Sequence, residues 1–238
     1  MNLRSVTITG ADDSTNQDDL VFLSRKYPFV EWGILVSGKH REGTFRFPSG
    51  AWASSFARKS IDNNMSVSVH LCGKLVRTLC DGTDSLMFYK NNKELIDSAK
   101  RIQLNFHAIT HTIKEPDFSR TLGSFKNHQF IFQLDGVNNM ILGDSRRKGL
   151  NAVPLFDTSG GIGRLPEYWP DPMNCYCGYA GGLSPENLEE QIRSIGAVAG
   201  ESPIWIDVET RVRSDDDSVL DIEKVDRFLS ISEKHIRG

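Results

Sequence analysis

Two glycine-rich segments in the second half of the chain have the composition of anion-binding loops. They are Asp157-Thr-Ser-Gly-Gly-Ile-Gly163 and Ala180-Gly-Gly-Leu-Ser-Pro-Glu-Asn187. Glycine lets backbone N–H groups approach an anion closely, and a helix that begins there adds partial positive charge. We therefore predict a site for a phosphate or a similar anion, with an ordinary tight turn as the alternative. The residues expected to contact the anion are Gly160, Gly161, Gly181, Gly182 and Leu183.

Two aspartates lie in or next to apolar segments and are candidates for proton transfer. Asp157 ends an apolar run, where burial would raise its pKa and make it a general acid. Asp207 lies between Ile206 and Val208, so its carboxylate must be paired or must face a polar cavity. The alternative role for Asp157 is a cap on the following turn. The alternative for Asp207 is a structural hydrogen bond.

Cysteine and histidine residues are also spaced so that they could share a strand face. His70 and Cys72 form one such pair, and Cys175 and Cys177 form another. Zinc needs three or four convergent ligands, and this spacing matches none of its usual motifs. We therefore expect no metal and no cofactor. Buried cysteines usually behave as small apolar residues, although Cys72 or Cys177 is also an alternative general base.

These candidates need a scaffold, and eight short apolar runs supply one. Each run is bounded by glycine, aspartate, asparagine or proline, and many are rich in valine, isoleucine or phenylalanine, which is typical of buried strands. The runs are Ser5–Thr9, Trp32–Val36, Ser66–Leu71, Arg101–Phe106, Gln129–Leu134, Ala152–Asp157, Asn174–Tyr179 and Pro203–Val208.

Segments with helical spacing alternate with these runs. In one of them, Ser184 is the expected N-cap and Pro185 the first helical residue. The segments Gly136–Gly149 and Leu165–Pro172 have no clear helical pattern and are expected to be short or irregular. The expected helices are Asp18–Tyr27, Ser49–Ile61, Lys93–Lys100, Pro185–Ala197 and Leu220–Ser232.

The alternation of strands and helices predicts parallel pairing with right-handed crossovers. Eight such units predict one closed (β/α)8 barrel, the TIM barrel, over residues 1–238, with a doubly wound open sheet as the alternative. In a barrel of this kind the active site lies at the carboxyl ends of the strands. Asp157, Asp207 and the two glycine-rich loops all fall there.

The overall composition excludes several classes of protein. The chain has 238 residues, of which 39% are hydrophobic and 25% charged, and this excludes a disordered, collagen-like or coiled-coil protein. A net charge of −3 gives no sign of a nucleic-acid partner. No apolar stretch approaches the ~20 residues of a membrane span, and the amino-terminal segment does not resemble a secretion signal. We expect a cytoplasmic monomer or homodimer that acts on a small phosphorylated molecule.

Several segments resemble the phosphoribosylanthranilate isomerase family. Leu155-Phe-Asp-Thr158 with Gly160-Gly-Ile-Gly-Arg164 is similar to the family's LLDT…GGxGxxFDW, and Ala180-Gly-Gly-Leu-Ser-Pro-Glu-Asn187 is similar to its AGGLxPEN. Shorter likenesses link Thr7-Ile-Thr-Gly10 to KICG and Ile206-Asp-Val208 to VDVSSG. Two more link Arg101-Ile-Gln-Leu-Asn105 to VQLHG and Arg46-Phe-Pro-Ser49 to PRYVSPE.

The resemblance implies a (β/α)8 isomerase of tryptophan biosynthesis. Such an enzyme opens the ring of N-(5′-phosphoribosyl)anthranilate by protonating the ring oxygen, removes the C2 proton and forms a ketone, without metal or cofactor. The family's general acid corresponds to Asp157, and Thr9 stands where the family has its catalytic cysteine. The corresponding substrate-binding residues are Arg46, Gln103, Asn105, Asp207, Glu209, Thr210 and Arg211.

Two departures from the family pattern leave other functions open. A threonine hydroxyl has no ionised form comparable to a thiolate, so Thr9 needs help to act as a base. In the loop after Asp207, the family's Ser-Ser-Gly is replaced by Glu209-Thr-Arg211. A carboxylate there repels a phosphate unless it points away or is paired. The alternative function is therefore a divergent barrel that binds a different anionic molecule, recognised in part by Arg213, with changed or lost catalysis.

Overall fold

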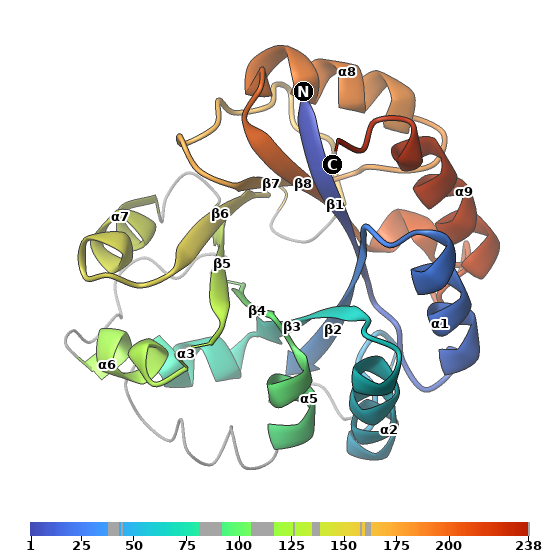
Figure 1. Ribbon diagram of the computed structural model, residues 1–238, viewed down its shortest axis with the longest axis horizontal. Helices are drawn as coiled ribbons and strands as arrows, with labels where there is room; N and C mark the ends of the chain where they lie inside the picture. The colour runs from blue at the N-terminus through green and yellow to red at the C-terminus, as the bar shows by residue number, and fades with distance from the viewer. Residues whose placement is uncertain are drawn as a thin grey trace.

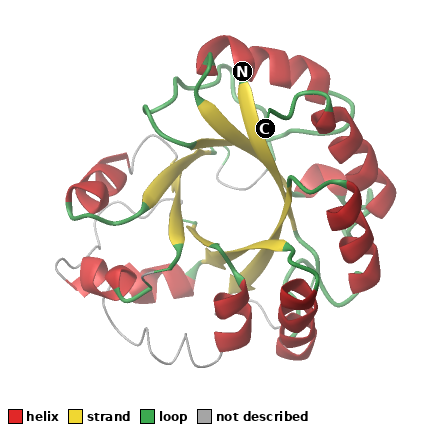
Figure 2. Cartoon of the chain, in the orientation of Figure 1, coloured by secondary structure: helices red, strands yellow, loops and turns green. Residues whose placement is uncertain are grey.

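The computed structural model describes residues 1–37, 43, 45–80, 92–105, 117–125, 127–134, 139–157, 159 and 163–237. Within these residues, parallel strands form a closed barrel in which the first strand pairs with the last. Helices surround the barrel on the outside (Figures 1 and 2). The predicted (β/α)8 architecture is confirmed, and the open-sheet alternative is wrong because an open sheet leaves its two edge strands unpaired.

All eight predicted strands are present and follow one another around the barrel. They are β1 (Asn2–Thr9), β2 (Val30–Ser37), β3 (Ser66–Cys72), β4 (Arg101–Leu104), β5 (Gln129–Leu134), β6 (Ala152–Phe156), β7 (Cys177–Ala180) and β8 (Pro203–Val208). The described helices are α1 (Gln17–Lys26), α2 (Gly50–Asp62), α3 (Lys74–Cys80), α5 (Lys93–Ser98), α6 (Asp117–Gly123), α7 (Asn139–Arg147), α8 (Leu188–Ala199) and α9 (Ile222–Glu233), with a 3-10 turn, η1, at Thr210–Val212.

Side-chain caps fix where three of the outer helices begin. The side chain of Asn16 accepts the N–H of Asp18 before α1, and Ser49 Oγ accepts the N–H of Trp52 at the start of α2. Asp221 accepts N–H groups from the first turn of α9. Each cap satisfies a backbone donor that the helix itself leaves free, which stabilises a helix by about 1 kcal/mol.

Some sequence-based boundaries need correction. The segment Gly136–Gly149, expected to be irregular, contains the helix α7, which buries Leu142 and Ser145. Its glycines weaken the apolar pattern from which a helix is inferred. The helix expected at Pro185 begins three residues later, because residues 185–187 form a turn in which Ser184 Oγ accepts the N–H of Glu186.

The seventh strand also begins later than expected, at Cys177 instead of Asn174. Asn174 has a φ of 49°, in the left-handed region, so the chain bends there before it enters the barrel. The fourth strand ends at Leu104, two residues before the expected end.

A buried ion pair crosses the interior of the barrel below the carboxyl ends of the strands. Arg101 donates from Nε to Glu31 Oε2 over 2.7 Å, and Thr7 Oγ1 donates to Glu31 Oε1 over 2.9 Å. The guanidinium of Arg101 also lies 4.4 Å from the ring centroid of Trp205. Burial raises the pKa of Glu31, but Arg101 outweighs burial and holds that pKa below its usual value. Charged groups therefore replace an apolar layer at the centre of this barrel.

Candidate active site

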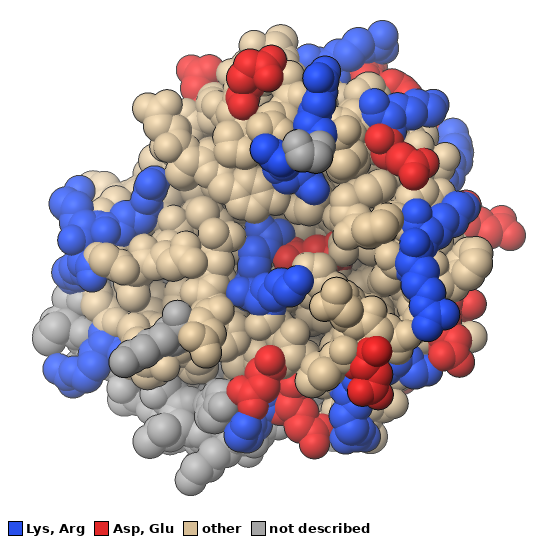
Figure 3. Space-filling view, viewed as in Figure 1, with Lys and Arg blue, Asp and Glu red and all other residues tan. Residues whose placement is uncertain are grey.

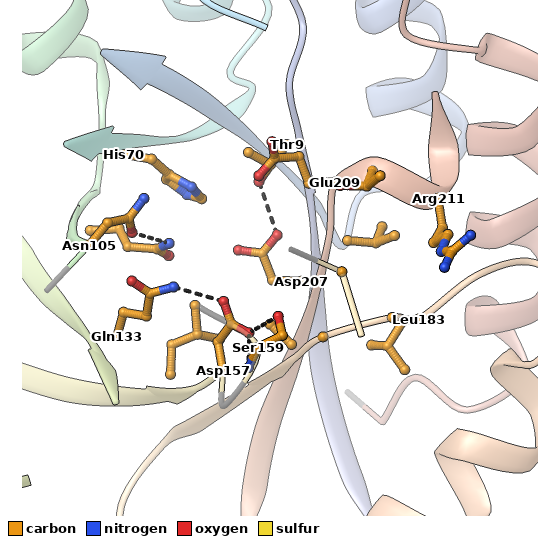
Figure 4. Close-up of a pocket in the computed structure, with 18 residues that line it drawn as sticks. Thr9, His70, Asn105, Gln133, Asp157, Ser159, Leu183, Asp207, Glu209 and Arg211 are labelled. Atoms are coloured by element: carbon orange, nitrogen blue, oxygen red, sulfur yellow. Dashed lines mark hydrogen bonds between the residues drawn. The ribbon is translucent and has the colours of Figure 1, made fainter. Parts of the chain in front are cut away.

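The carboxyl ends of the strands surround a pocket that contains most of the predicted site residues (Figure 4). Gly160 and Gly161 lie outside the described residues, and Arg46 lies beside the pocket instead of lining it. The predicted residues that line the pocket are Thr9, Gln103, Asn105, Asp157, Gly181, Gly182, Leu183, Asp207, Glu209, Thr210 and Arg211.

Asp207 projects from β8 into this pocket and is held by Thr9 from the neighbouring strand β1. Thr9 Oγ1 donates to Asp207 Oδ1 over 2.9 Å, and the two residues are 1% and 7% exposed (Figure 4). Burial raises the pKa of Asp207 well above its ordinary value, and the nearby carboxylate of Glu209 adds to this rise, while the hydrogen bond from Thr9 opposes it. Asp207 therefore keeps its proton to a higher pH than an exposed aspartate does.

Asp157 lies on the same pocket but in a different hydrogen-bonding environment. Its Oδ2 accepts Gln133 Nε2 over 2.7 Å, and its Oδ1 accepts the backbone N–H of Ser159 over 3.2 Å and Ser159 Oγ over 2.6 Å (Figure 4). The pocket thus contains two carboxyl groups with different hydrogen-bond partners: Asp157 accepts from Gln133 and Ser159, and Asp207 accepts from Thr9.

His70 projects into the pocket from β3, opposite Thr9. A Cβ atom at Gly33, on the strand between them, would lie 2.3 Å from Thr9 Oγ1 and 2.8 Å from Cε1 of His70. Only glycine therefore lets both side chains occupy this space. His70 Nε2 lies 2.9 Å from Ser68 Oγ, and burial lowers the pKa of His70 to about 3. The imidazole is neutral at physiological pH and can serve as a hydrogen-bonding group.

The buried neutral His70 predicts an unusual sensitivity of the fold to acid. An unfolded histidine has a pKa of about 6.5, so the folded state is stabilised above that pH and loses this contribution as the pH falls towards 3. Between pH 6.5 and 4, His70→Gln should therefore lose about 3 kcal/mol less unfolding free energy than the wild type. Urea unfolding at the two pH values measures this difference. An equal loss of unfolding free energy in His70→Gln and in the wild type would contradict the prediction.

The loop after β7 forms the wall of the pocket that leads to α8. Its conformation requires glycine at positions 181 and 182. Gly181 has a φ of 113° and Gly182 a φ of 67°. A Cβ at Gly182 would lie 2.5 Å from the backbone nitrogen of Leu165, and a Cβ at Gly181 would lie 2.9 Å from the carbonyl oxygen of Arg164. The Gly181–Gly182 loop therefore packs directly on the backbone of residues 164–165.

Two arginines flank this loop. Arg211 lines the main pocket and an adjoining cleft, whose other walls include Arg164, Gly182 and Ser184. Arg211 and Arg164 are exposed, and neither has an ion-pair partner among the described residues. Positive charge and a glycine turn thus meet at one end of the pocket, as an anion site requires.

Arg46 is bound by carboxylates of the chain itself. Its Nη1 donates to Glu209 Oε1 over 2.5 Å, and its Nη2 pairs with Asp217. Burial raises the pKa of Glu209, although Arg46 counteracts this. Glu209, the carboxylate in the loop after β8, is therefore paired with Arg46 and adds no unpaired negative charge next to the predicted anion site.

Arg213, the other arginine considered for ligand recognition, has a structural role. Its side chain is fully buried, and its guanidinium donates to the carbonyl of Gly10, to Asp12 Oδ2 over 3.2 Å and to Asp217 Oδ1 over 3.0 Å. These contacts tie the loop after β1 to the loop after β8. Arg213 is therefore committed to the scaffold of the site.

On the opposite side of the pocket, amide side chains continue the polar lining. Gln103 Nε2 donates to Asn105 Oδ1 over 2.9 Å, and Asn105 Nδ2 donates to Cys72 Sγ over 3.0 Å. Burial raises the pKa of Cys72 to about 12, so this thiol is not ionised near neutral pH and is a poor general base.

Sequence reasoning did not assign a role to three residues of the pocket: His70, Gln133 and Ser159. A signal for Gln133 was present, because it lies between Phe132 and Leu134 in an apolar strand, as Asp207 does between its own neighbours.

Within the described residues, no three histidine, cysteine or acidic side chains converge as metal ligands. No helix in the described part of the chain is long and apolar enough to cross a membrane. Figure 3 shows basic and acidic side chains interspersed on one face of the molecule.

Comparison with known proteins relates the chain to barrels of several activities. No protein-family model and no curated protein matches it. A truncated 3-deoxy-D-arabino-heptulosonate 7-phosphate synthase from Thermotoga maritima aligns with a TM-score of 0.58 and 11% identity over 98% of this chain and 86% of that one. KGPDC from Streptococcus mutans aligns with a TM-score of 0.52 and 11% identity over the whole of both chains.

A phosphoribosylanthranilate isomerase from Thermotoga maritima also matches, over 97% of this chain and 99% of that one, with 14% identity. Its TM-score of 0.42 is too low to support a specific relationship. The first two likenesses support the fold. The chain is a (β/α)8 barrel whose structural neighbours are enzymes of different activities.

Proposed function

We propose that the protein is an intramolecular aldose–ketose isomerase that acts on a phosphoribosyl-amine, as the resemblance to phosphoribosylanthranilate isomerases implies. The observation that carries the proposal is the pair Asp157 and Asp207, which face one pocket from β6 and β8 in different environments. Two carboxyl groups that face one pocket from different environments can divide the roles of acid and base between them.

The raised pKa of Asp207 and the hydrogen bonds to Asp157 suggest which carboxyl group has which role. Asp207, whose pKa is raised by burial, is the proposed proton donor to the ring oxygen of the sugar. Asp157, which accepts three hydrogen bonds, is the proposed base that removes the C2 proton. This assignment gives Asp157 the opposite role from the one that the family resemblance implies. Thr9 then orients Asp207 and takes no proton itself.

The phosphate is proposed to bind at the Gly181–Gly182 loop, next to Arg211. Three features favour binding of a phosphate dianion: the backbone turn at the two glycines, the chain that leads into the N-terminus of α8, and the guanidinium of Arg211, which has no ion-pair partner among the described residues. With the phosphate there, the ribose would lie in the pocket between Asp157 and Asp207. His70, Gln103 and Asn105 would then supply hydrogen bonds to its hydroxyl groups.

The reaction itself gives a direct test of the isomerase proposal. N-(5′-phosphoribosyl)anthranilate would be incubated with the protein in deuterium oxide and followed by NMR. The expected product is the ketose with one deuterium at C1, because the enolamine takes a solvent-derived proton there when it becomes the ketone. Ribose 5-phosphate serves as a comparison substrate that lacks the anthranilate group. If the protein binds inorganic phosphate but turns over neither compound, the proposed reaction is contradicted.

The phosphate site has its own prediction. Arg211→Gln should raise the Kd for inorganic phosphate about tenfold, which is the loss expected for one charge-assisted hydrogen bond. Isothermal titration calorimetry at constant ionic strength measures the change. Arg193→Gln, which removes an exposed arginine from the second turn of α8, is the matched control and should leave the Kd unchanged. Equal affinity in Arg211→Gln and the wild type would exclude the proposed position of the phosphate.

A second candidate function is an enzyme or binding protein for a different phosphorylated or anionic molecule. One observation favours it: the guanidinium of Arg46 is already bound by Glu209 and Asp217, so it is not free to bind a substrate carboxylate. Turnover of ribose 5-phosphate but not of N-(5′-phosphoribosyl)anthranilate would support this alternative, since ribose 5-phosphate carries no carboxylate.

A further inference from the structure

A pair of cysteines lies at the amino end of β7, at the opposite end of that strand from the Gly181–Gly182 loop. The ring of Tyr176, between them, packs 4.7 Å from that of Trp205, and its hydroxyl lies 2.7 Å from Ser5 Oγ. Cys177 is the first residue of β7, and Cys175, two residues before it, packs against the same buried hydrophobic cluster that contains Cys177. Their Sγ atoms are 3.8 Å apart.

The surroundings of the two sulfur atoms distinguish one from the other. Arg146 Nη1, from α7, lies 3.4 Å from Cys175 Sγ, which is half-buried. Cys177 is buried, and its thiol lies within hydrogen-bonding distance of two acceptors, the Sγ of Cys175 at 3.8 Å and the carbonyl oxygen of Cys175 at 3.2 Å. The backbone N–H of Met173 also contacts Cys177 Sγ, over 3.3 Å.

These contacts place the negative charge on Cys175. The hydrogen bond with Cys177 lowers the pKa of Cys175 to about 6, with Arg146 adding to the effect and burial opposing it. The same hydrogen bond and burial raise the pKa of Cys177. The half-buried Cys175 is therefore the cysteine of the pair that ionises more readily, and the buried Cys177 is the one that keeps its proton. A thiolate is the reactive form of cysteine towards electrophiles.

We propose that Cys175 and Cys177 form a peroxide-oxidisable dithiol site, in which Cys175 is the attacking thiolate and Cys177 the resolving thiol. The oxidant is a hydroperoxide, either hydrogen peroxide or an organic one. This site is separate from the sugar-phosphate pocket, and it does not depend on the proposed isomerase reaction.

The chemistry takes place in two steps. The Cys175 thiolate attacks the outer oxygen of the peroxide, the O–O bond breaks, and Cys175 becomes a sulfenic acid while hydroxide or alkoxide leaves. Cys177 gives its proton to that base, and its sulfur attacks Cys175, so that the S–S bond forms and hydroxide leaves from sulfur. Each sulfur loses one electron, and the two peroxide oxygens gain the two electrons.

The spacing of the two cysteines is compatible with a disulfide. Two residues of chain span at most about 7 Å between Cα atoms, and disulfides span about 4.4–6.8 Å. The sulfur atoms already face each other, so rotation of the side chains closes the remaining gap. Cys72 is unlike this pair, since its thiol is un-ionised and bonded to Asn105.

The experiment uses the full chain with Cys72→Ser and Cys80→Ser, which leaves only the cysteine pair. The reduced protein is treated with one equivalent of hydrogen peroxide at pH 6 and 7 and examined by intact mass and peptide mapping. We expect a loss of two hydrogen masses, located in the peptide that holds residues 175–177. In Cys177→Ser, dimedone should trap a sulfenic acid on Cys175. Trapping on Cys177 in Cys175→Ser at an equal rate would overturn the assignment.

A substitution of Arg146 tests the proposal in a protein that keeps both thiols. Arg146→Gln should slow the reaction at pH 6 about threefold to tenfold, because less of Cys175 is then ionised. Arg147→Gln removes a neighbouring arginine that pairs with Asp144 and should leave the rate unchanged. An equal rate in all three proteins, or in native and urea-unfolded protein, would show that the fold confers no special reactivity and would overturn the proposal.

Discussion

Asp207→Asn is expected to lower kcat/KM for isomerisation by about 100- to 10,000-fold, the loss typical for removal of a general acid or base. Asparagine has the same shape and can accept the hydrogen bond from Thr9, but it cannot deliver a proton to the ring oxygen. KM should change little, because the phosphate contacts lie elsewhere. In the wild type, kcat/KM should fall as the pH rises through the raised pKa of Asp207.

A variant of Thr9 tests whether Asp207 is the group that titrates. The hydrogen bond from Thr9 lowers the pKa of Asp207, so Thr9→Val should move the alkaline limb of the pH profile to higher pH. A merely structural role for Thr9 would lower activity without moving that limb. Residual activity in Asp207→Asn close to that of the wild type would assign the acid to another residue.

The same Asp207→Asn substitution should stabilise the fold at high pH. Because burial raises the pKa of Asp207, the folded state keeps its favourable protonated form below the unfolded pKa and loses that contribution as the pH rises. The variant should therefore gain in Tm relative to the wild type at pH 8 and differ little at pH 4. A protein that becomes more stable as it loses activity is the expected signature of a buried functional carboxyl group.

Breaking the ion pair inside the barrel should have the largest effect on stability. Arg101→Met leaves the carboxylate of Glu31 buried without its partner, and Glu31→Gln does the same to the guanidinium. Their side chains are 8% and 5% exposed, so each single variant is expected to lose about 3–5 kcal/mol of unfolding free energy. Urea unfolding at pH 7 measures the loss.

The double variant determines how much of that loss is specific to the pair. Glu31→Gln with Arg101→Met removes both charges of the pair, so its loss should be at least about 2 kcal/mol smaller than the sum of the single losses. Arg58→Ala, which breaks an exposed ion pair with Glu94, should cost less than about 1 kcal/mol. Strict additivity in the double variant would indicate that Glu31 and Arg101 act independently.

The barrel was predictable from the sequence because its strands are buried on both faces. Continuous apolar runs such as Gln129–Leu134 and Pro203–Val208 have few other interpretations when helical segments separate them. The position of Asp157 and Asp207 at strand ends was enough to place them at the same end of the barrel, where both line one pocket. The helix α7 was missed because glycines surround and interrupt its short apolar face.

The partners of the charged residues could not be predicted in the same way. Arg46 and Glu209 are 163 residues apart in the chain, and Arg213 and Asp12 are 201 apart. Closure of the barrel brings the loops after β1, β2 and β8 together, and small differences in side-chain reach then decide which carboxylate pairs with which arginine. A sequence pattern records neither the approach of these loops nor the reach of the side chains. From the sequence alone, Arg46 was therefore predicted to bind a substrate and Arg213 to bind a ligand.

Gly33 restricts the order in which this pocket can change over evolutionary time. A methyl group at that position overlaps Thr9 Oγ1 and the ring of His70, so almost any replacement of Gly33 is harmful while both neighbours are present. If His70 and Thr9 are first replaced by smaller residues, the same replacement becomes neutral. Lineages that kept His70 would therefore be confined to glycine at position 33. Lineages that lost His70 could place a larger residue at position 33, and that residue would then prevent the return of histidine at position 70.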